Sequence, residues 1–253
     1  MPAPHIPASL PHVVFDPLLI ATFIGLSIYE WRWYWPRMVR RMKAGEPGAR
    51  IRAYRNIVIF LWLGVGWVAA LWITQGRPWS ALLLGGAPLG RLAIGFGVAA
   101  LYVALATAQR RALLAKPEVL ERLKRRFEYA EPLVPRSLAE HGMFVGLSLS
   151  AGICEEIICR GFMMWYFGTW GPVAAVVLSS VVFGLGHLYI GFPHVIRTTL
   201  LGAVFALIAW LSGSLLPCIV LHAAIDWFAG DLGYRVYTGG ADRAHPEPQP
   251  GVA

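Results

Sequence analysis

The sequence predicts an all-α protein, a polytopic bundle of transmembrane helices, and three observations support this prediction. Charged residues make up only 14% of the 253 residues, whereas about 25% is usual in soluble domains. Long apolar runs recur along the chain, and the basic residues gather in two blocks beside them. A chain that is 57% hydrophobic and this poor in charge is suited to the lipid bilayer, where exposed charge is unfavourable.

The apolar runs predict about seven membrane spans. A helix needs about 20 apolar residues to cross the hydrocarbon core. Six to eight spans are compatible with the soft boundaries of the runs, and the fifth to seventh are short and joined by tight Gly- and Pro-containing turns. The expected spans cover residues 14–35, 55–75, 89–109, 140–168, 172–190, 196–212 and 214–231. We therefore expect one transmembrane domain over residues 1–237, followed by a disordered, polar C-terminal tail over 238–253.

The net charge of +8 predicts an orientation in the membrane rather than a nucleic-acid partner. Eight of the 22 Lys and Arg residues lie in residues 32–55, and eight more lie in residues 110–136. With seven spans both blocks lie on the same side, which the positive-inside rule identifies as the cytoplasm. The N-terminus is then expected outside and the C-terminus in the cytoplasm. No Lys or Arg precedes the first apolar run, so we expect that run to stay as an anchor.

Ionisable residues inside the fourth expected span are the first candidates for chemistry, because such residues are costly in a membrane. The stretch GICEEIICRGF places Glu155, Glu156 and Arg160 in the middle of this span. Glu156 and Arg160 are four residues apart, so they share a helix face and can form an ion pair. Glu155 is rotated by about 100° from Glu156 and points elsewhere. A structural ion pair explains Glu156 and Arg160 but leaves Glu155 without a partner.

Two later spans carry histidines in apolar surroundings. The fifth contains FGLGHLY, with His187 one turn after Phe183, and the seventh contains CIVLHAAIDWF, with His222 and Asp226 four residues apart. Short loops make consecutive helices neighbours. A carboxylate and two imidazoles that meet in a bundle can support general acid–base or metal-assisted hydrolysis. By residue count His187 is expected nearer the cytoplasmic side than His222, a difference that tilted or broken helices can close.

These motifs resemble the CPBP family, which comprises type II CAAX prenyl endopeptidases and bacteriocin-processing or self-immunity proteins. The resemblance rests on EExxxR at Glu155, Glu156 and Arg160, on FxxxH at Phe183 and His187, and on the final His222 four residues before a polar residue. It covers about residues 140–230, the protease-like core. It implies an all-helical intramembrane endopeptidase with its active site within the membrane, in a bacterial inner membrane, acting on a membrane-embedded or membrane-adjacent peptide.

The resemblance also implies a role for each matching residue. Glu155 would activate the attacking water with the help of His187, while Glu156 and Arg160 would support the site. His222 and the residue four positions later would hold the oxyanion. The family was long described as metalloproteases, and a metal-free glutamate mechanism is the competing account.

Asp226 departs from the family pattern, which usually has Asn at this position. An ionised aspartate accepts hydrogen bonds but cannot donate one to an oxyanion. In one arrangement, which we favour, apolar surroundings keep the carboxyl group neutral so that it donates as an amide would. In a second, an ionised Asp226 binds a metal or orients a protonated His222. In a third, Asp226 merely reaches water near the end of the seventh span.

The residue types leave the metal question open. Glu155, His187 and His222 would make a plausible zinc set of two histidines and one glutamate, with Asp226 as a further ligand or a supporting carboxylate. The chain contains no HExxH motif. We therefore expect no cofactor, with zinc as the alternative.

The sequence leaves more than one interpretation open both for the substrate and for whether the protein is a catalyst. Prenyl processing requires a prenylated partner, which the sequence does not reveal. Peptide maturation, processing of sorting tails and bacteriocin immunity fit equally well. A different class of function is a non-catalytic membrane scaffold or immunity protein, or a transporter whose polar cluster lines an ion pathway. The paired halves typical of transporters are not visible in the sequence.

Overall fold

The computed structural model describes residues 10–115, 122–125 and 131–238, and all regular secondary structure in these ranges is helical. The expected all-α bundle is thereby confirmed. The expected tail lies, from residue 239 on, outside the described residues. The first span consists of α1 (Leu10–Tyr29), the π-helical turn η1 (Glu30–Tyr34) and α2 (Trp35–Lys43). It is followed by α3 (Ala49–Thr74), the 3₁₀ turn η2 (Trp79–Leu82) and α4 (Leu89–Leu114).

The second half of the chain begins with the short turn η3 (Glu131–Leu133). Next comes one long helical unit made of α6 (Leu138–Glu155), the π-helical segment η4 (Glu156–Met163), α7 (Met164–Phe167) and the 3₁₀ turn η5 (Gly168–Trp170). The remaining elements are α8 (Pro172–Leu185), the 3₁₀ turn η6 (Leu188–Ile190), α9 (Phe192–Ser212) and α10 (Leu216–Thr238).

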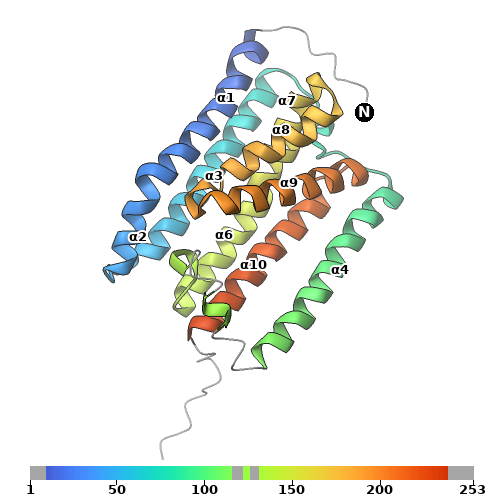
Figure 1. The fold of residues 1–253 in the computed structure, drawn as a ribbon. Helices are drawn as coiled ribbons and strands as arrows, with labels where there is room; N and C mark the ends of the chain where they lie inside the picture. The colour runs from blue at the N-terminus through green and yellow to red at the C-terminus, as the bar shows by residue number, and fades with distance from the viewer. Residues whose placement is uncertain (1–9, 116–121, 126–130, 239–253) are drawn as a thin grey trace, which may run out of the picture.

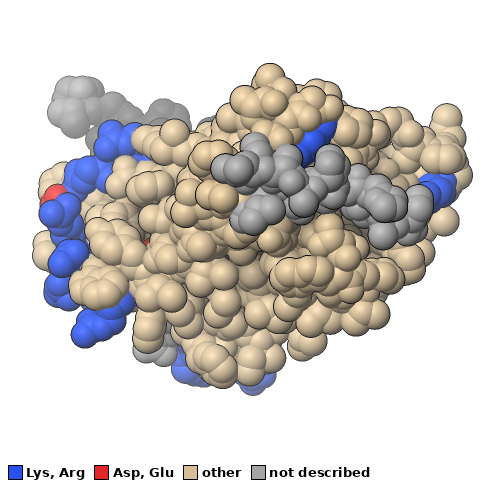
Figure 2. Space-filling view, turned by 90° about the horizontal axis from the view of Figure 1, so that it is seen from above, with Lys and Arg blue, Asp and Glu red and all other residues tan. Residues whose placement is uncertain are grey.

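Six helical units of the described chain are long and apolar enough to cross a membrane. They are Val14–Lys43, Ala49–Thr74, Leu89–Leu114, Leu138–Trp170, Phe192–Ser212 and Leu216–Thr238. They support an integral membrane protein. Figure 2 shows a surface that is almost free of charge, with most of the visible Lys and Arg side chains along one edge. This is the surface that contact with lipid requires.

The expected span over residues 172–190 differs from the others, because the structure forms only the 14-residue helix α8 there. A helix of this length rises about 21 Å, which is less than the roughly 30 Å of a hydrocarbon core. The apolar composition of the segment continues to Ile190, but its helix stops at Leu185 and a tight turn follows. In that turn Gly191 has a φ of +113°, a conformation that favours glycine, and α9 starts directly after it.

Helix α6 lies between the two edges of the bundle. It packs against α3 on one side and α10 on the other, and α4 lies beyond α10. Figure 1 shows α1 and α4 at opposite edges, and it shows the start of α1 and the end of α10 at opposite ends of the molecule. Helices α8 and α9 pack together as a hairpin, which lies between α7 and α10 in the chain.

Buried ion pairs fasten both ends of the bundle. At the end where α1 begins, Arg77 Nη1 and Nη2 donate to the fully buried Asp16 carboxylate over 3.0 and 2.8 Å. The Arg77 guanidinium also lies over the Trp165 ring, 4.5 Å from its centroid. At the opposite end Arg110 Nε donates over 2.6 Å to Asp231, which joins α4 to α10. These contacts hold the helices at fixed positions along one another's axes.

The arrangement yields a prediction about topology. A reporter fused after residue 45 and another after residue 125 should both report the cytoplasm, while a reporter after residue 80 should report the outside. The reason is that the two basic blocks follow helices that end on the same side of the bundle. Paired alkaline phosphatase and green fluorescent protein fusions would measure this. A cytoplasmic signal at residue 80 would contradict the orientation.

Candidate active site

The acidic pair Glu155–Glu156 lies where α6 changes to π-helical geometry. Helix α6 ends at Glu155, and η4 begins at Glu156. π-Helical turns are rare and occur frequently at functional sites. The change of geometry separates the two carboxylates: Glu156 is fully buried in the protein, whereas Glu155 lines a cavity. The two neighbouring residues therefore face different surroundings, as their spacing predicts.

Glu156 forms the centre of a buried network. Its Oε1 atom accepts a hydrogen bond of 2.9 Å from Arg160 Nη1 and another of 2.7 Å from His222 Nδ1. Arg160 is 1% exposed and His222 is 4% exposed. Buried charges are tolerated when they are paired and hydrogen-bonded. The ion pair expected from the i, i+4 spacing is present, and the histidine of α10 is attached to the same oxygen.

Arg160 also joins η4 to α8 and α9. Its Nη2 atom donates to the backbone carbonyl of Gly202 over 3.2 Å. Its guanidinium lies 4.0 Å from the centroid of the Phe183 ring and 5.1 Å from that of Phe205. Cation–π contacts of this kind gain strength where water is excluded. Arg160 therefore stabilises the position of three elements as well as the charge of Glu156.

The hydrogen bond to Glu156 sets the orientation of His222. Because a carboxylate accepts hydrogen bonds, Nδ1 of His222 carries a hydrogen and Nε2 faces the opposite way. Nε2 lies 3.9 Å from Glu155 Oε2 and 3.7 Å from Asp226 Oδ2. The imidazole stacks on Phe205, with ring centroids 5.3 Å apart. One nitrogen is thus fixed in the interior, and the other lies between the two remaining carboxylates.

His187 lies at the end of α8, and a backbone bond sets its orientation. Its Nδ1 atom is 3.0 Å from the carbonyl oxygen of Phe183. A carbonyl only accepts, so Nδ1 carries the hydrogen, and in the neutral ring Nε2 has a free lone pair. The Phe183 ring centroid lies 4.9 Å from that of His187 and 5.8 Å from that of His222. The Phe183 ring therefore lies in contact with both histidines.

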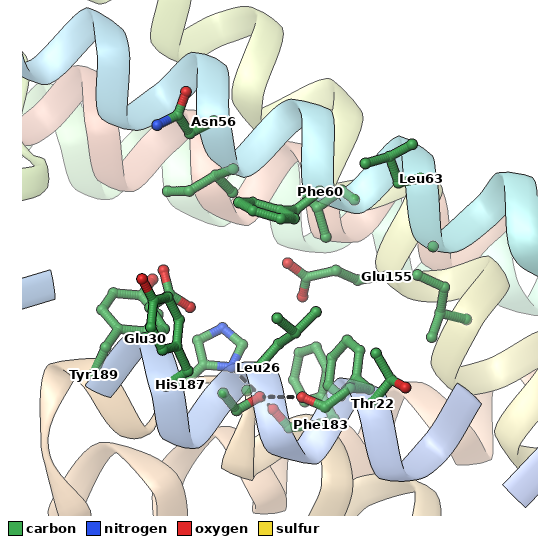
Figure 3. A pocket seen from close by; sticks show the side chains of 18 of the residues that line it. Thr22, Leu26, Glu30, Asn56, Phe60, Leu63, Glu155, Phe183, His187 and Tyr189 are labelled. Atoms are coloured by element: carbon green, nitrogen blue, oxygen red, sulfur yellow. Dashed lines mark hydrogen bonds between the residues drawn. The ribbon is translucent and has the colours of Figure 1, made fainter. Parts of the chain in front are cut away.

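Glu155 and His187 line a cavity of about 600 Å³ between α1 and α3. Its wall is mostly apolar and includes Phe60 and Leu63, while Figure 3 shows Glu155 and His187 among the few polar groups that reach it. The Asp226 side chain is 35% exposed. The candidate residues thus fall into three groups. Glu155 and His187 line the cavity, and Glu156, Arg160 and His222 form a buried network. Asp226 is more exposed and lies beside His222.

Close helix packing brings these groups together. A Cβ atom at Gly152 would lie 2.9 Å from both the Ile219 carbonyl oxygen and the Ala223 nitrogen, so α6 and α10 touch through their backbones just before Glu155. A Cβ atom at Gly184 would lie 2.8 Å from the Val195 carbonyl oxygen, which shows the same close approach between α8 and α9. Small residues at helix interfaces permit such contacts in membrane proteins.

Four lining residues were missed in the sequence: two of them lie in residues 14–35, which look like a simple anchor with an aromatic belt, and the other two lie outside the motifs. They are Glu30, Tyr34, Asn56 and Tyr189. Asn56 Nδ2 donates to the Tyr34 hydroxyl oxygen over 3.0 Å. A signal for Glu30 exists in the sequence, since it is an acidic residue inside the first expected span, and such residues are functional candidates.

The residues considered for zinc do not gather into a ligand set. Within the described residues no group of three or more His, Cys, Asp or Glu side chains is placed so that it could hold a metal ion. We therefore derive no step through a metal.

Comparison with known proteins bears on the same segment. Residues 138–228 match the family model of Rce1-like type II CAAX prenyl endopeptidases. The resemblance seen in the motifs is thereby confirmed from α6 to the middle of α10. No curated protein and no solved structure matches the chain. The family match and the six candidate spans together support an intramembrane protease in an integral membrane protein.

The close contact at Gly152 generates a prediction about stability. Gly152→Ala should lower the free energy of unfolding by about 1–3 kcal/mol, because its methyl group meets the backbone of α10 and cannot be accommodated without displacing that helix. Gly146→Ala is the matched control, since a Cβ atom there meets nothing within 4 Å on the same helix. Thermal unfolding in detergent measures both variants. Equal melting temperatures for the two would contradict the tight α6–α10 contact.

Proposed function

We propose that this chain is an intramembrane endopeptidase that hydrolyses a peptide bond with a water molecule activated by Glu155. The supporting observation is that Glu155 reaches the cavity, whereas its neighbour Glu156 is committed to Arg160 and His222. A general base must be free to take a proton from water at the site of attack. Of the two adjacent carboxylates, only Glu155 meets this requirement.

His187 assists from the opposite side of the cavity in this proposal. Its Nδ1–H group is held by the Phe183 carbonyl, so the Nε2 lone pair can accept a hydrogen bond from the water. Glu155 takes the proton as the water attacks the peptide carbonyl, and it then delivers a proton to the leaving amine. The free Nε2 atom of His187 keeps the water oriented for attack.

In this proposal the protonated imidazole of His222 stabilises the negative charge that develops on the oxyanion. Glu156 fixes its Nδ1–H group, and a hydrogen on Nε2 provides the donor that an oxyanion requires. Asp226 Oδ2 lies 3.7 Å from this nitrogen, and 35% of the Asp226 side chain is exposed. This geometry supports the arrangement in which an ionised Asp226 keeps His222 protonated, in preference to a neutral carboxyl group that donates directly.

The substrate class follows from the cavity. Its walls are mainly apolar and belong to α1 and α3, which suits a peptide segment that is embedded in or adjacent to the membrane. A prenylated cysteine and an unmodified hydrophobic segment both fit this chemistry. The deciding experiment incubates proteoliposomes of the full chain with a library of synthetic hydrophobic peptides, with and without a farnesylated cysteine, and maps the cuts by mass spectrometry.

The catalytic assignment predicts different outcomes for two adjacent substitutions. Glu155→Gln should lower turnover by about 10²–10⁴-fold with no loss of folded protein, because it removes the base. Glu156→Gln should instead lower the free energy of unfolding by about 3 kcal/mol, because it leaves Arg160 without its buried counterion. Turnover in proteoliposomes and thermal unfolding in detergent measure the two effects. Near-normal turnover by a folded Glu155→Gln protein would refute the base assignment.

Asp226→Asn tests the oxyanion arrangement. With an ionised Asp226 that stabilises the His222 imidazolium, the amide should cost roughly tenfold or more in turnover at neutral pH and should confine activity to lower pH. The measurement is the pH profile of kcat, with the amount of folded protein checked by size-exclusion chromatography. Activity that extends to higher pH would favour the neutral carboxyl donor instead, and an unchanged profile would exclude both arrangements.

A further inference from the structure

A second carboxylate shares the cavity with Glu155, and it comes from the first span. Glu30 opens the π-helical turn η1, and it lines the same cavity as Glu155 and His187. Figure 3 shows Glu30, His187 and Tyr189 at one end of the cavity, with Glu155 reaching into it from another element. A substrate segment that contacts Glu155 therefore also passes Glu30.

Glu30 has no positive partner within the part of the chain that the structure describes. There it forms neither an ion pair nor a side-chain hydrogen bond. The buried cation of this region, Arg160, is taken by Glu156 and by the Gly202 carbonyl. Arg32, two residues after Glu30, is exposed and lies over the Trp33 ring instead. A carboxylate in apolar surroundings without a counterion is suited to a positive charge that arrives with a ligand.

Two other polar groups of the cavity, Ser27 and Asn56, have hydrogen-bond partners within the described chain, whereas Glu30 has none there. Ser27 Oγ donates to the Phe23 carbonyl oxygen over 2.9 Å, and Asn56 donates to Tyr34. Aromatic rings make up much of the remaining wall. They belong to Tyr29, Tyr34, Phe60, Trp67, Phe183 and Tyr189. A carboxylate framed by aromatic faces is the chemistry that binds ammonium and guanidinium groups.

From this arrangement we infer that Glu30 is a specificity-determining residue, which selects substrates carrying a Lys or Arg side chain close to the scissile bond. The inference rests on the proposed endopeptidase function and adds the chemical class of the side chain recognised. The cation neutralises Glu30 in the cavity, and the aromatic rings shield the pair from water. Glu155 and His187 then meet the neighbouring peptide bond.

The test uses matched peptides that differ in one charge. A hydrophobic peptide cleaved by the wild-type protein is made with Lys or with norleucine at each position next to the mapped cut. Both versions are acetylated at the N-terminus and amidated at the C-terminus, so the Lys side chain is their single difference in charge. The readout is the ratio of kcat/KM for the Lys peptide to that for the norleucine peptide, measured on the full chain in proteoliposomes.

The wild-type protein should prefer the Lys peptide at one position by about tenfold or more, as a charge-assisted hydrogen bond in apolar surroundings requires. Glu30→Gln should bring this ratio close to one, mainly through a higher KM for the Lys peptide. Glu46→Gln is the matched control, because Glu46 is an exposed carboxylate in the turn after α2 that pairs with Arg52. Its variant should keep the wild-type ratio.

Three outcomes would overturn the inference: a wild-type ratio of one at every position, an unchanged ratio in Glu30→Gln, or an equal loss on both peptides. The last would show that Glu30 acts on the chemistry or the fold rather than on substrate choice. Should Glu30→Gln fail to fold, Glu30→Asp takes its place, since it keeps the charge but withdraws it by one methylene. Its ratio must then fall, and an unchanged ratio counts against the inference.

Failure of the proposed function is distinguishable from failure of this inference. If the wild-type protein cleaves no peptide of the library, the endopeptidase proposal fails. Selectivity is then measured as binding, by isothermal titration of the Lys and norleucine peptides against wild-type and Glu30→Gln protein. Tighter binding of the Lys peptide that disappears in Glu30→Gln supports recognition by Glu30 without cleavage, and equal dissociation constants overturn it.

Discussion

One carboxylate oxygen, Oε1 of Glu156, holds together the elements from which the candidate site is built. It accepts hydrogen bonds from Arg160 and from His222, and all three groups are buried. Leaving any of them unpaired would place an uncompensated polar group in the interior, which is far more costly than at a surface. Because Arg160 also reaches Gly202, this single oxygen determines how η4, α9 and α10 meet. The direction of His222 Nε2 is a consequence of that constraint.

Both cavity carboxylates occur where α-helical geometry is interrupted. Glu30 is the first residue of η1, and Glu155 is the last residue of α6 before η4. A π-helical turn accommodates one extra residue, which rotates the following side chains relative to the preceding ones. In each unit the helix before the interruption and the helix after it therefore present differently rotated faces. Two separate helices thus contribute charge to one cavity while their remaining surfaces stay apolar.

Much of the fold could be predicted from the sequence, because the length of an apolar run and the position of a basic block each determine how a whole segment is placed. The i, i+4 spacing also predicted the contact between Glu156 and Arg160, since that contact lies within one helix. What the sequence could not show depends on relations between helices. The sharing of one Glu156 oxygen with His222 is such a relation, and so is the place of Glu30, whose aromatic neighbours resemble an ordinary membrane interface. The end of α8 at Leu185 was missed because apolar composition continues past it.

The shortness of α8 has a consequence for the supply of water. Its end and the turn to α9 fall within the depth that other helices cross, yet the backbone there is irregular. Part of this backbone is satisfied internally, since Gly191 N bonds to Leu188 O over 3.0 Å and the Phe183 carbonyl accepts from His187. Irregular backbone at membrane depth is tolerated where it is buried in protein or meets a hydrated space. His187 lies at this point and lines the cavity. In the proposed hydrolysis water is itself a reactant, and the cavity beside the truncated helix is the space through which it would reach His187.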